Sequence, residues 1–138
     1  MIAYLDTSAL LRLVLGEPGG LEELLSVEAL VSSELLAVES WRTIDRLRLQ
    51  GNLTAEEAAS RRATATEWLE AVDLVLLRRP VLVRASEPFP TPLGTLDALH
   101  LATALTWQDR TSQSLVMATH DGDLALAARS YGIEVVGA

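Results

Sequence analysis

Cysteine is absent from this 138-residue sequence, and histidine occurs only twice, as His100 and His120. Without cysteine the protein has no disulfide, no thiolate nucleophile and no cysteine-based zinc site. Two histidines leave little for a histidine-rich metal site. Any metal site in this chain must therefore be built mainly from oxygen ligands.

Lysine is also absent, because all 11 basic residues are arginine. A phosphate-binding P-loop needs a Gly-Lys-Ser/Thr sequence, and none occurs here. Phosphorylation-switch receiver domains and haloacid-dehalogenase-like phosphatases also need a lysine. In addition, the sequence "DTS" at residues 6–8 differs from the Asp-x-Asp motif of those phosphatases. These three function classes are excluded.

Long apolar runs are missing as well. No stretch approaches the roughly 18 apolar residues of a membrane span. The first residues carry no basic segment ahead of an apolar one, so we expect no signal peptide, a cytoplasmic location and no membrane partner. The length predicts a single domain, residues 1–138, with one substantial hydrophobic core.

Positive charge is scarce, and the formal net charge is −8. Nucleic-acid-binding proteins usually carry a basic surface, so this balance argues against that function. One exception is compatible with the composition. Carboxylates that hold divalent cations add to the negative count, yet the loaded site attracts phosphate.

Short apolar runs alternate with longer helical patterns along the chain. Strands are expected at residues 2–5, 29–32, 72–77, 114–119 and 133–136. Helices are expected at residues 8–16, 33–50, 54–69, 80–86, 95–107 and 123–132. Ser8 and Thr95 are the expected N-caps of two helices, and Thr54 with Glu57 forms a capping box. The pattern predicts an α/β protein, a three-layer α/β/α fold with a five-stranded, mostly parallel sheet.

Four carboxylates are expected at one end of that fold. Asp6 directly follows the first strand, and Asp121 comes two residues after the fourth. Asp97 lies in the first turn of an almost wholly apolar helix, and Glu39 lies about two turns into the second helix. Ligands of parallel sheets bind beyond the carboxyl ends of the strands. Clustered like charges are costly unless a cation lies among them, and hard oxygen donors favour Mg²⁺ or Mn²⁺.

Each acid also has a purely structural interpretation. Asp6 can cap the first helix, and Asp97 can interact with the positive end of its helix. Asp121 can open a turn in the sequence "DGD", and Glu39 can form a surface pair with Arg42. The metal-site hypothesis depends on the four acids acting jointly.

The motifs that carry these acids resemble those of a known family. "YLDTSALLRL", "VSSELLAVESWR", "LGTLDALHLATAL" and "MATHDGDLALAARSYGIEVV" look like the successive motifs of the PIN domain. More closely, they resemble the VapC-type toxins of bacterial and archaeal toxin–antitoxin pairs. The resemblance implies a metal-dependent endoribonuclease whose catalytic and metal-binding acids are Asp6, Glu39, Asp97 and Asp121. Glu34 remains an alternative to Glu39, and Asp123 remains an alternative to Asp121.

The resemblance also implies partners. An RNA substrate, a cognate antitoxin that blocks the site, and a second copy of the chain in a homodimer are expected. Apolar helix faces such as "LLRLVL" and "ESWRTIDRLRL" could serve either protein partner or internal packing. The RNA that is cut stays open. The rival function is a PIN-like module that binds RNA or protein without cleaving it.

Further polar residues stand near the four acids in the sequence. Thr7, Ser8 and Thr119 either hydrogen-bond ligand carboxylates or cap helices and turns. The expected phosphate contacts are four arginines on or near the acid-bearing helices: Arg12, Arg42, Arg46 and Arg48. His100 is expected to be a satisfied core residue, and His120 is a weaker candidate for substrate contact.

Overall fold

The structure is a computed structural model that describes residues 1–138. Five parallel strands form one sheet in the order β3-β2-β1-β4-β5. The strands are β1 (Ile2–Leu5), β2 (Ala29–Ser33), β3 (Val72–Val75), β4 (Val116–Ala118) and β5 (Glu134–Val136). The predicted five-stranded α/β fold is confirmed, and the sheet is parallel throughout.

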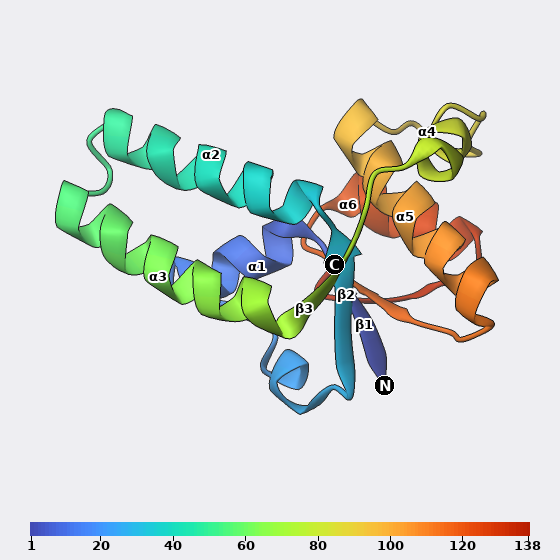
Figure 1. Cartoon of the computed structure of the whole chain (residues 1–138), viewed down its shortest axis with the longest axis horizontal. Coiled ribbons are helices and arrows are strands. Elements are labelled where there is room, and N and C mark those ends of the chain that lie inside the picture. The colour runs from blue at the N-terminus through green and yellow to red at the C-terminus, as the bar shows by residue number, and fades with distance from the viewer.

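Six α-helices and one short 3-10 helix connect the strands (Figure 1). They are α1 (Thr7–Val14), η1 (Glu22–Ser26), α2 (Leu35–Leu49), α3 (Ala55–Ala71), α4 (Arg79–Ala85), α5 (Thr95–Thr111) and α6 (Gly122–Ser130). The helix η1 was not predicted. Its five residues are too few to establish a helical period in the sequence. No helix of the protein is long and apolar enough to cross a bilayer.

Two hydrophobic cores lie on opposite faces of the sheet, because successive strand residues point to opposite sides. Ala3 and Leu5 of β1 join the core beneath α1, α2 and α3. Tyr4, between them, joins the core beneath α5 and α6. Figure 1 shows α2 and α3 side by side on one side of the sheet and α5 with α6 on the other. The arrangement is the predicted three-layer α/β/α fold.

Of the two residues considered as the cap of the first helix the structure has Asp6 rather than Ser8, and the cap expected at Thr95 is wrong. The helix α1 is capped by Asp6, whose side chain accepts a hydrogen bond from the backbone N–H of Ser8. The helix α5 begins after Gly94, so Thr95 is its first residue rather than its cap. The Thr54–Glu57 capping box of α3 is confirmed, with both hydrogen bonds present. Its partners lie three residues apart, so local sequence was enough to identify it.

The sheet order places the reversal of the chain between β1 and β4. From β1 the chain proceeds to β2 and β3 on one side, and then returns to β4 and β5 on the other. The backbone N–H of Asp6 donates to the carbonyl of Ala118 at 3.0 Å, which joins the carboxyl ends of these two strands. Such a reversal point is where open parallel sheets bind ligands.

Candidate functional site

Asp6 lies at this reversal point and is held by hydroxyl groups from both sides. Its side chain is almost completely buried. The oxygen Oδ2 accepts hydrogen bonds from the hydroxyls of Ser8 at 2.6 Å and Thr119 at 2.8 Å. It also accepts the 3.4 Å contact from the Ser8 backbone N–H that caps α1. The other oxygen, Oδ1, accepts no hydrogen bond, so it is the one available to a ligand.

Glu39 reaches the same region from the second turn of α2. Its Oε1 accepts hydrogen bonds from the Thr7 hydroxyl at 2.9 Å and from Nε2 of His100 at 2.6 Å. Burial favours the neutral acid, but the hydrogen bond and charge of His100, with the Thr7 hydrogen bond, outweigh it and lower the pKa of Glu39. Glu39 is therefore an ionised carboxylate with one oxygen, Oε2, left free. The expected surface pair with Arg42 is not formed, since Arg42 pairs with Asp45.

Asp97 shows that the four acids share one electrostatic environment. It lies in the first turn of α5 and accepts no hydrogen bond from another residue. Burial, the charges of Asp121 and Asp6, and more weakly the charge of Glu39 raise its pKa to about 6, against an opposing effect of His100. The sequence motifs that carry these carboxylates are therefore brought together at one end of the fold.

Asp121 approaches from the start of α6. Its Oδ1 caps that helix by accepting from the backbone N–H of Leu124 at 2.9 Å, and its Oδ2 accepts no hydrogen bond. Thr119 orients this turn, because its hydroxyl oxygen accepts from the Asp121 backbone N–H at 3.0 Å. Asp121 thus caps α6 with one oxygen and also belongs to the group of four acids with the other oxygen free.

The two alternative acids lie at the margin of this group. Glu34 is the residue before α2, and its side chain forms no cap hydrogen bond. Asp123 is exposed in the first turn of α6. Neither contributes to the pKa shift of Asp97, whereas Glu39 and Asp121 both do. The structure thus favours Glu39 over Glu34 and Asp121 over Asp123.

The donor set suits a hard divalent cation. Each of the four carboxylates keeps at least one oxygen free of hydrogen bonds, and the mutual repulsion that raises the pKa of Asp97 is what a cation would relieve. As the side chains stand, no three acidic or histidine residues are close enough together to form a complete metal site. Carboxylate rotation or bridging water would be needed to complete the coordination, as is common for Mg²⁺.

The polar residues around the acids have two roles at once. Thr7, Ser8 and Thr119 all donate hydrogen bonds to site carboxylates, and Ser8 and Thr119 also take part in the adjoining helix starts. His100 is buried, as expected, but it also contacts Glu39. The Nδ1 of His120 faces the carbonyl oxygen of Gly137 at 2.8 Å, and its Nε2 has no hydrogen-bond partner.

The four arginines expected to bind phosphate contact none of the four acids. Arg42 and Arg48 both pair with Asp45 on the exposed side of α2. Arg12 donates to the backbone carbonyl of Pro18, and Arg46 forms no ion pair. All four lie on or beside helices that carry site acids, and Arg42, three residues after Glu39, pairs with Asp45 rather than with Glu39.

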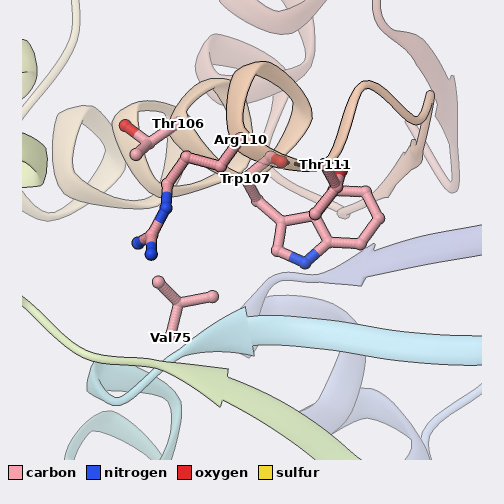
Figure 2. Close-up of a pocket in the computed structure, with 5 residues that line it drawn as sticks. All are labelled: Val75, Thr106, Trp107, Arg110 and Thr111. Carbon is pink, nitrogen blue, oxygen red and sulfur yellow. Dashed lines mark hydrogen bonds between the residues drawn. The ribbon is translucent and has the colours of Figure 1, made fainter.

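One arginine that was not selected from the sequence lines a surface hollow of about 300 Å³ (Figure 2). The hollow lies between Val75 at the end of β3 and the last two turns of α5, which supply Thr106, Trp107, Arg110 and Thr111. Arg110 forms no salt bridge and points across the hollow toward Val75. The sequence "TWQDR" contains Trp107 and Arg110 three residues apart, which places them on one helix face.

Comparison with known proteins agrees with this arrangement. Residues 3–130 match the PIN domain family. The chain is 31% identical over 137 residues to ribonuclease VapC46 of Mycobacterium tuberculosis, covering 96% of this chain and 95% of that protein. A chain with the same fold occurs in the crystal structure of VapBC2 from Rickettsia felis, which was solved bound to a DNA fragment from the VapBC2 promoter. That chain is 12% identical, with a TM-score of 0.68 over 99% of this chain and 98% of that one.

The family match covers most of the residues described here, including all four acids. The similarity to VapC46 extends over nearly the full length of both chains. This chain therefore belongs to the PIN domain family and is a PIN domain of the VapC type.

Proposed function

We propose that this protein is a divalent-metal-dependent endoribonuclease that acts as the toxin of a type II toxin–antitoxin pair. The observation that carries the proposal is the convergence of Asp6, Glu39, Asp97 and Asp121, with the pKa of Asp97 raised by burial and by the charges of the other three. The similarity to a ribonuclease along nearly the whole chain supports it. Mg²⁺ or Mn²⁺ is the proposed cofactor, and these four acids are the residues that would hold it.

A bound divalent ion supplies Lewis-acid stabilisation of the phosphodiester and activates water for in-line attack. The protein's own residues prepare that site. Thr119 and Ser8 fix Asp6 in one orientation, and Thr7 with His100 fixes Glu39. Asp97 and Asp121 present their free oxygens from the starts of two helices, α5 and α6. No side chain here needs to act as a nucleophile.

The rival function is binding of RNA or protein without cleavage. One observation favours it: no three of the acidic and histidine side chains are close enough to hold an ion as they stand. Two others argue against it, namely the retention of all four acids and the free oxygen on each of them. Metal binding and hydrolysis separate the two functions.

We also propose a cognate antitoxin and a homodimer. The resemblance to VapC-type toxins implies an antitoxin partner, and this chain shares the fold of one chain of the VapBC2 structure. The apolar faces singled out in the sequence are largely used internally, because Leu10, Val14 and Ile44 are fully buried. Exposed apolar side chains occur on several elements, among them Leu49 at the end of α2 and Leu82 and Val83 of α4. Light scattering should give about twice the 14.9 kDa mass of one chain if the homodimer forms.

The decisive experiment is cleavage of a mixed panel of structured and single-stranded RNAs with Mn²⁺. Wild type is compared with Asp6→Asn and Asp121→Asn, each with and without EDTA. Wild type should cut, and both variants and the chelated samples should lose activity by at least about 100-fold, because each variant removes a metal ligand. Asp123→Asn is the matched control, since Asp123 is exposed and lies outside the electrostatic group.

The outcomes distinguish the hypotheses clearly. Cleavage that disappears in both ligand variants and persists in Asp123→Asn supports the nuclease and its site together. Equal cleavage by wild type and Asp6→Asn would show a contaminating nuclease or a wrong site. Binding of Mn²⁺ and RNA with no cleavage of any RNA would favour the non-catalytic module.

A further inference from the structure

A row of buried side chains lies behind the carboxylates, running from Tyr4 through His100 to Glu39. We propose that His100 is a positioning residue, whose Nε2–H permanently holds Glu39 in its ligand orientation while Tyr4 holds the opposite edge of the ring. The inference rests on the proposed function, since the orientation matters for catalysis only if Glu39 is a metal ligand.

The contact between Nε2 of His100 and the carboxylate of Glu39 requires a proton on that nitrogen. The Oε1 of Glu39 lies 2.6 Å from Nε2 and 2.9 Å from the Thr7 hydroxyl, so both groups meet the same carboxylate oxygen. An ionised carboxylate can only accept hydrogen bonds. The hydrogen atom of this bond must therefore come from Nε2 of His100.

The partner of Nδ1 is compatible with the same assignment. The Tyr4 hydroxyl lies 2.8 Å from Nδ1, and the two rings meet edge to face with their centroids 5.9 Å apart. Tyr4 is completely buried, and burial raises its pKa far above the usual range, so the hydroxyl keeps its proton. A hydroxyl can donate to Nδ1 of the neutral ring, which leaves the ring's own proton on Nε2.

The consequence for the site is a fixed Glu39. Its Oε1 receives hydrogen bonds from both His100 and Thr7, so Oε2 is left as the free oxygen. The same Nε2 lies 3.7 Å from Oδ1 of Asp6, between two of the proposed ligands. His100 is 1% exposed, so no substrate reaches it, and its effect must pass through the carboxylates.

Simple periodicity explains how the chain brings this row to the acids. Tyr4 and Asp6 are two residues apart, and alternate residues of a strand point to the same side. Asp97 and His100 are three residues apart on α5, which places them on neighbouring positions of one helix face. Each of these segments thus delivers one acid and one supporting residue to the same place.

The hydrogen position can be tested directly by ¹⁵N NMR of the imidazole rings. The protein has only two histidines, and the structure gives them opposite tautomers. His100 should carry its proton on Nε2, and His120 should carry its proton on Nδ1, which faces the Gly137 carbonyl. The spectrum is recorded without metal or RNA and at alkaline pH, because burial lowers the pKa of His100 but the hydrogen bond to Glu39 and the charges of the nearby acids outweigh it and raise that pKa. A His100 proton on Nδ1 would overturn the inference.

Two substitutions separate positioning from packing. The amide nitrogen of Gln reaches about as far as Nε2 of histidine, whereas that of Asn reaches only as far as Nδ1. Mn²⁺ affinity, measured by calorimetry, should stay within about threefold of wild type in His100→Gln. It should fall by about 10- to 100-fold in His100→Asn, the usual loss when a supporting residue of a metal ligand is removed. Equal affinity in both variants would overturn the role assigned to Nε2.

Tyr4→Phe provides a second test that conserves side-chain volume, with Tyr131→Phe as its matched control. Tyr131 is partly exposed, packs against Phe89, and forms no hydrogen bond through its hydroxyl. Tyr4→Phe should weaken Mn²⁺ binding, but less than His100→Asn does, and Tyr131→Phe should leave it unchanged. Equal affinities in the two Phe variants would remove Tyr4 from the inference. Urea unfolding confirms that each variant is folded.

Failure of this inference is distinguishable from failure of the proposed function. The tautomer measurement uses neither metal nor RNA, and the affinity series uses Mn²⁺ alone. If no RNA is cut but His100 holds its proton on Nε2 and the Gln and Asn variants differ, the positioning role stands and the nuclease proposal fails. If RNA is cut and those variants bind Mn²⁺ equally, the nuclease stands and the positioning role fails.

Discussion

At the scale of single residues, the four acids differ in how the protein holds them. Asp6 and Glu39 each have one oxygen that accepts hydrogen bonds from at least two residues. Asp97 accepts no hydrogen bond, and burial and the negative charges of its neighbours raise its pKa. Asp97 is therefore the acid whose charge is most costly to the metal-free protein. Protonation of Asp97 should therefore change the free energy of unfolding of the whole chain.

Replacing Asp97 by Asn should stabilise the metal-free protein at pH 7. The pKa of Asp97 is about 6 in the folded protein, compared with an ordinary value of 3.8. Between these values the folded state binds more protons than the unfolded chain, so the free energy of unfolding contributed by this group falls as pH rises. The variant should equal wild type below about pH 4 and exceed it above about pH 6, in urea titrations with EDTA.

Asp109→Asn is the control for that experiment, because Asp109 is an exposed acid on the same helix. Its stability curve should run parallel to that of wild type at every pH. A parallel curve for Asp97→Asn as well would mean that Asp97 carries no special electrostatic cost.

Glu39 and Glu34 provide a second comparison between single residues. Glu39→Gln should lower RNA cleavage by at least about 100-fold, since it removes a proposed metal ligand, while Glu34→Gln should cut like wild type. Both activities are measured on the same RNA with Mn²⁺. Loss of cleavage only in Glu34→Gln would exchange the roles of the two residues.

At the scale of elements, α2 connects the site to the main core. Leu36, Ser40 and Ile44 are four residues apart and all completely buried, so they form the face that packs on the core. Val38 lies on the opposite side of the helix and is 58% exposed. The packing of α2 can therefore be weakened without touching Glu39.

Ile44→Ala should lower the free energy of unfolding by about 2–5 kcal/mol, because it leaves a cavity in a closely packed core. Val38→Ala removes a similar amount of side chain from the exposed side, and its effect should stay within about 0.5 kcal/mol. Urea unfolding measures both values. Similar losses in the two variants would show that α2 does not pack as the structure has it.

Helices and strands were predictable from the sequence where the residues that determine them lie close together in the chain. The strands and most helices follow from periodicity, and the Thr54–Glu57 capping box from a three-residue spacing. The sequence left both Asp6 and Ser8 as possible caps of α1, because both side chains suit that position, and it did not predict the cap at Gly94, which has no capping side chain. The choice at Asp6 involves the hydroxyl of Thr119, which is 113 residues away in the chain.

Part of the candidate site was likewise predictable from the sequence and part was not. The four acids follow from strand ends and from the family motifs, but their supporting hydrogen bonds do not. Tyr4 was treated only as part of an apolar run, and its contact with His100 joins residues 96 positions apart. Such a partner becomes visible only once strand order is known, which places β1 beside β4 and under α5.

At the scale of the whole molecule, the excess of negative charge makes stability depend on cations. The net charge is −8, and four of the acids gather at one place. Binding of Mn²⁺ to the folded state alone stabilises it by mass action, by about 2.7 kcal/mol at a concentration one hundred times the Kd. For a chain of this length that corresponds to a rise in Tm of roughly 10 °C.

Differential scanning fluorimetry with increasing Mn²⁺ measures this response, with NaCl added to equalise ionic strength. Asp6→Asn should lose most of the rise in Tm, while Asp123→Asn should keep it. An equal rise in all three proteins would indicate cation binding to the acidic surface in general rather than to the four acids.

The position of β1 between β2 and β4 also has a consequence for synthesis of the chain. Asp6 is made well before Thr119, which orients it, because 113 positions of the chain separate the two, and Asp121 follows Thr119. A nascent or prematurely terminated chain that lacks β4 and α6 cannot assemble the acids into one group. If the proposed activity is correct, the ribosome that makes this protein is spared from its action on RNA until β4 and α6 have been made.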